Sequence, residues 1–370
     1  MSDDDNTEPV RELRLRFEGE AGEYFRIWIV NLCLTLLTLG VFSAWAKVRK
    51  KRYFYSHTVL DGTPFQYLGQ PLPILKGRIV AAILFATYYA VSHFFTSLLP
   101  LVIVAGLALA PWAVARSAAF TARYSAYRNM TFAFTGDYRS AAGALYWLGL
   151  VPIAATGLAY QSAVEIESGF VPAAVAIAAA LFGFLFPWWL ARLRTFLVRH
   201  TAFGGVDAQI HIRGGQFWGI YFRGGLLIAV GGAISGGLSA VAIGGLHLPP
   251  YVAGPLVLAG LYGGYVFGYA YIKAASANLV WNNTQLEPLR FVSTLRGRDL
   301  AWLYLSNAAA IVASLALLTP WAVIRTLKYR AAHMRVLLDG ELTAFAGSDA
   351  SSVQAAGAEV SEIFDLDLSL

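Results

Sequence analysis

The chain has 370 residues, of which 57% are hydrophobic and only 14% are charged, and its formal net charge is +6. An average soluble domain has about 25% charged residues, so this composition all but excludes a water-soluble protein and indicates a membrane protein. The one cysteine, Cys33, excludes a disulfide framework and any metal cluster built on cysteines. We expect no cofactor.

The first 23 residues are polar and acid-rich, and no positively charged segment in them leads into an apolar one. We therefore expect a short solvent-exposed tail and no signal peptide. Within this stretch, RELRLRFEG at 11–19 alternates in a way that is typical of a strand. It resembles the second half of a β-hairpin.

Uncharged windows locate the membrane segments. They are residues 27–46, 79–115, 140–164, 168–191, 224–272 and 300–324. One helical crossing needs about 20 apolar residues, so the windows 79–115 and 224–272 each hold two crossings. Turn formers stand at their midpoints, Pro100 in the first and residues 247–250 in the second. The chain therefore has eight apolar segments.

The positive charges set the orientation of these segments. All 28 lysines and arginines lie in six stretches, and the connections near Pro100, Glu165–Glu167 and Pro249 have none. By the positive-inside rule, every basic stretch belongs in the cytoplasm. Single crossings at 27–46 and 300–324 would place both chain ends outside, together with the basic residues beside them.

We therefore predict that the two outermost segments enter the membrane and return on the same face. Breaks at 38–40 (Thr-Leu-Gly) and at Thr319-Pro320 permit the return, although re-entrant backbone must be covered by other protein. The expected fold is a mainly α polytopic helical bundle with about six crossings, two re-entrant hairpins and both termini in the cytoplasm. Eight straight crossings are the alternative.

An aromatic helix end followed by a basic residue recurs along the chain. Its copies are SAWAKVR (43–49), PWAVAR (111–116), PWWLAR (187–192), PWAVIR (320–325) and the degenerate GYAYIK (268–273). Residue pairs that accept positive φ follow these helix ends and predict β-hairpin turns. They are Asp61-Gly62, Gly204-Gly205, Asn282-Asn283 and Asp339-Gly340. The repeat is thus a helical hairpin, a basic helix end and a cytoplasmic β-hairpin, and the hairpins should pair into a sheet or barrel-like cap.

The stretch EYFRIWIVNLCLTLLTLGVFSAWAKVRKKRYFYSHTVLDGTPFQYLGQPLPILKGR (23–78) resembles the YjgN family of bacterial inner-membrane proteins, and PWAVIRTLKYR (320–330) repeats the likeness. The resemblance implies a multi-span protein of the bacterial cytoplasmic membrane. It brings no assigned activity and no catalytic residues. We expect residues 1–347 to form the transmembrane bundle with its interleaved β-hairpins, and 348–370 to form a disordered acidic tail.

Three polar residues within the apolar windows are candidate cavity-lining groups. Asn31 and Asn307 each stand 14 residues before a repeat tryptophan, and His93 is ionisable. Either the two asparagines face a central cavity, or they form hydrogen bonds between helices. His93 is either a functional intramembrane group or a residue that reaches the outer interface.

A basic run at the membrane face is the candidate lipid-headgroup site. It consists of Lys47, Arg49, Lys50, Lys51 and Arg52. Such a run beside aromatic residues is suited to anionic lipid, and it also serves as a topological stop signal. Nucleic-acid binding is not expected, because these charges already set the orientation.

Two further patterns each have a functional and a structural interpretation. His57, His200 and His333 each follow a repeat tryptophan by 12 residues, which fits a symmetric metal site or three helix C-termini. Glycines recur every four residues at Gly260, Gly264 and Gly268 and at Gly232 and Gly236. They indicate close helix packing, with a flexible gate as the alternative.

No HExxH, P-loop or GxSxG motif and no paired carboxylate site is present in the sequence, so we do not expect an enzyme. Two roles remain open. The repeat architecture suits a channel or transporter for a small solute or lipid. The lack of acidic or basic residues deep in any window and the basic-aromatic belt suit a non-transporting scaffold or lipid-organising protein. Nothing in the sequence indicates an oligomeric state.

Overall fold

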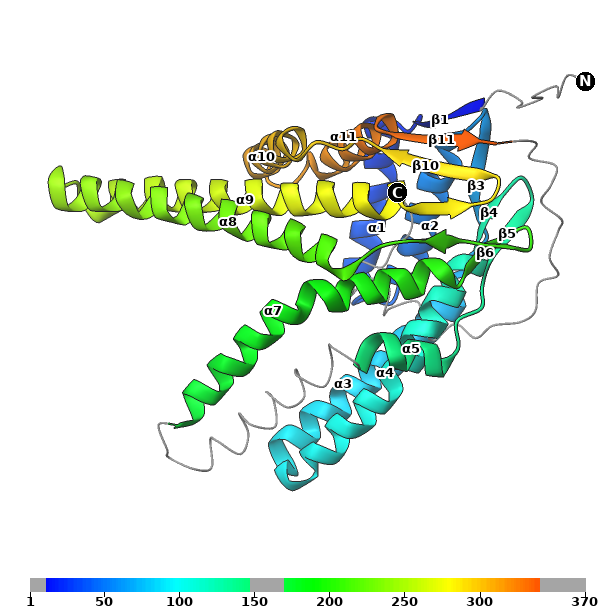
Figure 1. The fold of residues 1–370 in the computed structure, drawn as a ribbon, viewed down its shortest axis with the longest axis horizontal. Coiled ribbons are helices and arrows are strands. Elements are labelled where there is room, and N and C mark those ends of the chain that lie inside the picture. Colours follow the sequence, from blue (N-terminus) through cyan, green and yellow to red (C-terminus); the bar gives the residue numbers. More distant parts are fainter. Residues whose placement is uncertain (1–10, 147–169, 340–370) are drawn as a thin grey trace, which may run out of the picture.

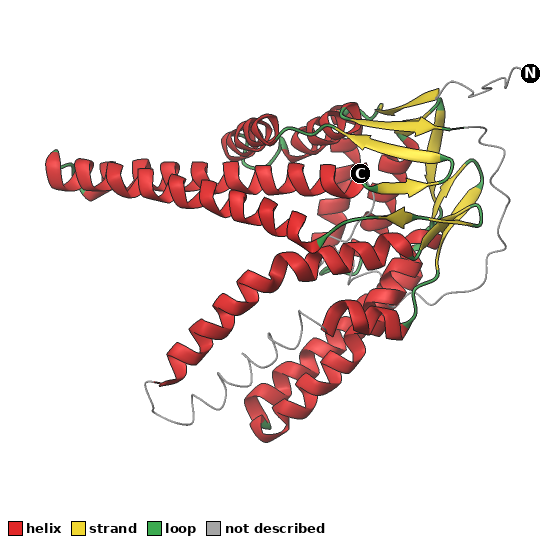
Figure 2. Cartoon of the chain, viewed as in Figure 1, coloured by secondary structure: helices red, strands yellow, loops and turns green. Residues whose placement is uncertain are grey.

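The computed structural model describes residues 11–146 and 170–339. Its strands gather at one end of the molecule, and the helices extend from that end (Figures 1 and 2). The helices are α1 (Ala21–Leu37), α2 (Ser43–Ser56), α3 (Pro71–Phe94), α4 (Leu99–Arg123), α5 (Tyr138–Leu145), α7 (Phe170–Arg199), α8 (Gly214–Ser239), α9 (Pro250–Asn282), α10 (Gly297–Ala313) and α11 (Thr319–Ala332). Short helical turns precede α4 and follow α8, at Thr96–Leu98 and Ala240–Gly245.

Eleven short strands form one antiparallel sheet in the order β7-β6-β5-β4-β3-β2-β1-β11-β10-β9-β8. They are β1 (Arg11–Phe17), β2 (Thr58–Leu60), β3 (Thr63–Tyr67), β4 (Ser125–Tyr127), β5 (Met130–Phe134), β6 (Thr201–Phe203), β7 (Val206–Asp207), β8 (Gln209–Ile210), β9 (Thr284–Leu286), β10 (Leu289–Ser293) and β11 (Met334–Leu338). The two strands that end this order, β7 and β8, are separated in the chain by Ala208 alone.

The hairpins β2–β3, β4–β5 and β9–β10 each have a second strand that pairs on both sides. In β3, Pro64 pairs with Val59 of its own hairpin, and Gln66 pairs with Ala126 of the next repeat. Three of the hairpin turns have positive φ at both central residues, namely Asp61-Gly62, Arg128-Asn129 and Gly204-Gly205. This is the type I′ geometry that matches the twist of the strands. The predicted turns at Asp61-Gly62 and Gly204-Gly205 are confirmed.

One of the predicted turns is wrong, and another lies at the limit of the described residues. Asn282 is the last residue of α9, and its side chain binds both the amide and the carbonyl of Ser293, so the β9–β10 turn lies instead at Glu287-Pro288. The predicted turn at Asp339-Gly340 follows β11, and Gly340 lies outside the described residues. Both edges of β11 are occupied, one by β10 and the other by β1 from the opposite end of the chain. Residues 340–347 lie outside the described part of the chain.

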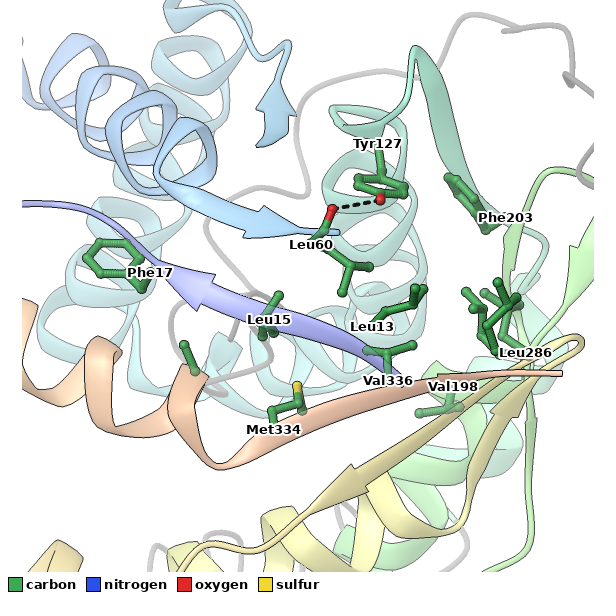
Figure 3. Packing of buried hydrophobic residues seen from close by; sticks show 14 of the residues in the cluster. Leu13, Leu15, Phe17, Leu60, Tyr127, Val198, Phe203, Leu286, Met334 and Val336 are labelled. Atoms are coloured by element: carbon green, nitrogen blue, oxygen red, sulfur yellow. Dashed lines mark hydrogen bonds between the residues drawn. The ribbon is translucent and has the colours of Figure 1, made fainter. Parts of the chain in front are cut away.

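The strand predicted at 11–19 is confirmed as β1, which pairs with two other strands. β1 pairs with β11 through Arg11–Arg14 and with β2 through Leu15–Phe17. It thus completes a hairpin whose two strands come from the two ends of the chain. Its side chains alternate, with Leu13, Leu15 and Phe17 buried among residues of β2, β6, β9 and β11 (Figure 3).

The helical hairpins begin and end at the sheet. The turn of α1–α2 has positive φ at Leu39 and Gly40, and that of α10–α11 has it at Leu315 and Ala316. The first break therefore lies where it was predicted. The second comes before Thr319-Pro320, because proline fits the first turn of a helix and here begins α11.

Five helical segments among the described residues are long and apolar enough to cross a membrane. They are Pro71–Phe94, Thr96–Arg123, Ala179–Arg199, Gly214–Gly245 and Tyr251–Asn282. Most of their apolar surface is exposed, with 11–39% of each window buried. The predicted crossing at 140–164 lies largely outside the described residues. The mainly helical membrane fold is confirmed.

Candidate functional site: a lysine-bearing chamber inside the sheet

Five helices end at the sheet, each two residues before the start of a strand. They are α2, α4, α7, α9 and α11. In four of them, the first residue of the following strand is Thr or Ser, and its hydroxyl donates to the carbonyl four residues earlier, at 2.7–2.8 Å. These residues are Thr58, Ser125, Thr201 and Thr284. Met334 takes the position after α11. This shared bond fixes the register of the helix on its strand, so equivalent positions can be compared between repeats.

The strands and these helices line a partly open chamber of about 320 Å³. Every described lining residue belongs to a strand or to one of these five helices, except Ala208 between β7 and β8. Most of the lining is apolar, and its aromatic members are Phe17, Phe54, Tyr55, Phe65, Phe132, Phe203, Trp281 and Phe291. The volume lies at the lower end of the range for small-molecule sites, about 300–1,000 Å³.

Helix α2 supplies all the charge of this lining. Lys47, Lys50 and Lys51 are its only ionisable groups other than Tyr55 among the described residues, and no carboxylate lines it. At the equivalent positions of α4 stand the uncharged residues Val114, Ser117 and Ala118. The charge that the described residues bring to the lining is therefore concentrated on one helix.

Two of the three lysines lie near aromatic rings, and the three differ in exposure, with Lys47 buried, Lys51 half-buried and Lys50 exposed. Lys50 Nζ is 5.8 Å from the centre of the Phe54 ring, and Lys51 Nζ is 5.4 Å from that of Tyr67. Ammonium groups at such distances are attracted by the ring faces. Lys47 is buried, with 8% of its surface exposed. The arrangement holds three cations at one wall of an apolar space.

The predicted headgroup set thus divides into two parts. Arg49 is exposed and does not line the chamber. Arg52 is also exposed, and its Nη2 donates to the carbonyl of Gly69 at 3.2 Å. The helical period therefore places Lys47, Lys50 and Lys51 on the inner face of α2 and Arg49 and Arg52 away from it.

The two candidate asparagines lie within their own helical hairpins and not at the chamber. Asn307 donates to the carbonyl of Ala322 at 3.2 Å and to Thr326 at 3.1 Å, and accepts from Arg325 at 3.1 Å. Asn31 has one long contact, 3.5 Å to the carbonyl of Ala46. Its buried Oδ1 has no hydrogen-bond partner among the described residues.

The four candidate histidines are each close to a carbonyl of their own helix. The Nδ1 atoms of His57, His200 and His333 are 2.7–2.8 Å from the carbonyl oxygens four residues earlier. His93 makes the same contact with Tyr89 at 3.1 Å, close to the end of α3, and is exposed. Within 11–146 and 170–339, no three His, Cys, Asp or Glu side chains form a metal-binding group.

The chamber itself could not be predicted from the sequence. Its lining is drawn from most of the strands and from five helices, so no contiguous motif marks it. One signal was available: in the repeat register only the first copy has a lysine at all three of the positions 47, 50 and 51, whereas the α9 copy has Lys273 and the α7 copy has Arg194 at one of them.

The fold defines an integral membrane protein built of helical hairpins on an antiparallel sheet. The family described as "Bacterial protein of unknown function (DUF898)" matches residues 12–363, and the chain belongs to this family. It is also similar to the "Inner membrane protein YjgN" of Salmonella typhimurium, 45% identical over 53 residues, and to that of Escherichia coli K12, 34% identical over 73 residues. The predicted YjgN resemblance is thereby confirmed.

These pairwise matches are short. They cover 14% and 20% of this chain and 13% and 17% of the two relatives. No solved structure matches the chain. Both relatives are inner-membrane proteins by name, which agrees with the apolar helices seen here.

Proposed function

We propose that the protein is a multi-pass protein of the bacterial inner membrane that binds anionic lipid at its cytoplasmic face, without transporting a solute and without enzymatic activity. The observation that carries the proposal is the apolar chamber with three lysines on one wall. Of the two roles suggested by the sequence, this supports the lipid-organising one, because an ammonium cluster beside apolar surface complements an anionic amphiphile.

The proposed topology places the sheet in the cytoplasm as a closed, barrel-like cap. Its support is that each helical hairpin leaves one strand and returns to the neighbouring one, as α3–α4 does between β3 and β4. All hairpins therefore point into the same compartment. Because the basic residues lie at the sheet ends of the helices, the positive-inside rule assigns the sheet to the cytoplasm.

Helix lengths support two re-entrant hairpins. At a rise of about 1.5 Å per residue, the 24 residues of α3 span about 36 Å, which exceeds the bilayer core of about 30 Å. The 17 residues of α1 and the 14 of α2 span only about 25 and 21 Å. The same lengths recur in α10 and α11. Both termini would then lie in the cytoplasm.

Cysteine labelling tests this topology. In a Cys33→Ser background, Ser97→Cys between α3 and α4 should react with an impermeant maleimide in intact spheroplasts, because that turn would face the periplasm. Glu12→Cys and Asp339→Cys, at the sheet, should react only after lysis. Labelling of either sheet position before lysis would contradict the proposed orientation.

Lipid retention tests the binding role. The full chain, purified in detergent and offered equal amounts of phosphatidylglycerol and phosphatidylcholine, should retain the anionic lipid preferentially in native mass spectrometry. The preference should decline with rising ionic strength, because it depends on charge. Equal retention of the two lipids would refute the proposed function.

A further inference from the structure

We propose that residues 363–370 of this same chain dock on the chamber as an extended segment and insert apolar side chains into it. The partner is a part of the protein that lies outside the described residues, and the surface that receives it is the apolar lining formed by the strands. The inference goes beyond the proposed function, because this docking requires no lipid.

The chamber is apolar, small and partly open. Six of its lining side chains come from five strands and belong to one hydrophobic cluster, shown together in Figure 3: Leu15, Leu60, Phe203, Leu286, Met334 and Val336. Apolar surface is more stable against another apolar group than against water. At about 320 Å³ the space is comparable to a small-molecule site, so a polypeptide enters it with a few side chains and not as a folded domain.

The hydroxyls of the lining decide which part of a segment can enter. Those of Thr58, Ser125, Thr201 and Thr284 each donate to a helix carbonyl. Backbone carbonyls that entered the chamber would therefore find no donor in these groups, and buried backbone groups need partners. The backbone of a docked segment stays at the opening, in contact with water, and only the side chains of one side enter.

The segment 363–370 has the pattern that such docking needs. Its sequence, IFDLDLSL, alternates between apolar and polar residues from Phe364 onward. In an extended chain, successive side chains point to opposite sides. One side then carries Phe364, Leu366, Leu368 and Leu370, and the other carries Asp365, Asp367 and Ser369. The apolar side needs a surface to cover it, whereas the polar side is suited to water.

The segment is attached to the wall of the chamber that it would enter. Val336 lines the chamber, and Asp339 is the last described residue of the chain. The 23 residues of 340–362 reach at most about 75 Å when extended, whereas α2 is only about 21 Å long. The connection is therefore long enough for the segment to return to the opening. Because a tether raises the effective concentration, even a weak contact leads to docking.

Charge at the opening agrees with this partner. Residues 340–370 contain six acidic residues and no lysine or arginine. Lys50 lines the chamber and is exposed, so it lies where the chamber meets water, close to the polar side of the docked segment. An exposed ion pair contributes little. Lys47 and Lys51 have interactions of their own, so the docking depends on apolar side chains and not on an unbalanced charge.

A bimane label at Ser369→Cys in a Cys33→Ser chain tests whether the segment reaches the chamber. Ser369 lies on the polar side of the alternation, so the label replaces no inserted side chain. Bimane fluorescence is quenched on contact with tryptophan, and Trp281 lines the chamber. In the full chain in detergent, the label should be quenched, and Trp281→Phe should abolish this quenching. The same label at Ser351→Cys, earlier in the tail, should be unaffected by Trp281→Phe.

Substitutions within the segment test which side enters. Phe364→Ser/Leu366→Ser/Leu368→Ser should abolish the quenching at position 369, because the inserted side chains are lost. Val353→Ser/Val360→Ser, the matched control in the same tail, should leave it unchanged. All five residues lie outside the described helices and strands, so these variants leave the contacts of the described fold in place.

Three outcomes would overturn the proposal. The first is a label at position 369 that is insensitive to Trp281→Phe. The second is quenching that survives Phe364→Ser/Leu366→Ser/Leu368→Ser. The third is quenching of a labelled Trp281→Phe chain when unlabelled protein with Trp281 is added, which would place the segment in the chamber of a second copy.

These measurements separate the inference from the proposed function. They contain no anionic lipid, so their failure leaves anionic-lipid binding standing. Equal retention of phosphatidylglycerol and phosphatidylcholine in native mass spectrometry would refute the lipid-binding role, while the docking of 363–370 would stand on the bimane quenching.

Discussion

Gly264→Leu is expected to lower the melting temperature of the protein in detergent more than any surface change. Gly264 of α9 faces Gly231 of α8, and an ideal Cβ on Gly264 would lie 2.6 Å from the Gly231 Cα. The reverse distance, from a Cβ on Gly231 to the Gly264 Cα, is 2.5 Å. Because the obstacle is backbone, no side-chain rotation relieves the clash, and the two helices must separate.

The expected loss of stability is about 3 kcal/mol, the upper part of the usual range for overpacking. Membrane helices gain their association largely from close packing, so an opened crossing also loses the contacts above and below it. Ser235, whose hydroxyl donates to the Val257 carbonyl, and the Gly224–Gly268 approach lie on the same interface. A thermal-shift measurement in detergent gives the effect.

Gly263→Leu is the matched control, because an added Cβ there meets nothing within 4 Å. It changes the same residue type on the same helix and should leave the melting temperature nearly unchanged. If the two variants melt together, the α8–α9 crossing does not depend on the glycine contact and the arrangement of this hairpin is wrong.

The glycine pattern shows how far the sequence could go. The predicted face at Gly260, Gly264 and Gly268 does contact α8, since an added Cβ at each would lie within 3.4 Å of an α8 atom. On α8, Gly232 and Gly236 were predicted to form the packing face. The close contacts with α9 are instead made by Gly231 and Ser235. Adjacent glycine pairs offer two faces with equal spacing, and only the partner helix decides between them.

The strands likewise show that features set by neighbouring residues could be predicted, whereas those set by contacts between distant residues could not. Turn residues such as Asp61-Gly62 predicted hairpins correctly, because positive φ is a local requirement. Asn282-Asn283 failed because Asn282 serves a distant contact with Ser293 instead of a turn. The chamber depends on all repeats at once, so its lysines were predicted as a surface belt. Their division into inner and outer faces needed the structure.

Leu13→Ala is expected to destabilise the whole sheet by about 2–5 kcal/mol, the usual cost of truncating a buried leucine. Leu13 is fully buried in the main core cluster. It lies in β1, which joins β11 to β2 and so connects the two ends of the chain. A cavity at this position weakens the core between β1 and the strands that it joins (Figure 3).

Arg14→Ala, at the next position, provides the control. Arg14 is exposed on the outer face of the same strand, and surface changes of this kind usually stay within about 0.5 kcal/mol. Both variants keep the backbone pairing with β11, so a difference between their melting temperatures measures core packing alone. Equal melting temperatures would place the inner face of β1 outside the core. Since β1 pairs with both β2 and β11, Leu13→Ala should also increase protease cleavage near both chain ends, because loosening this strand releases the pairing on each side.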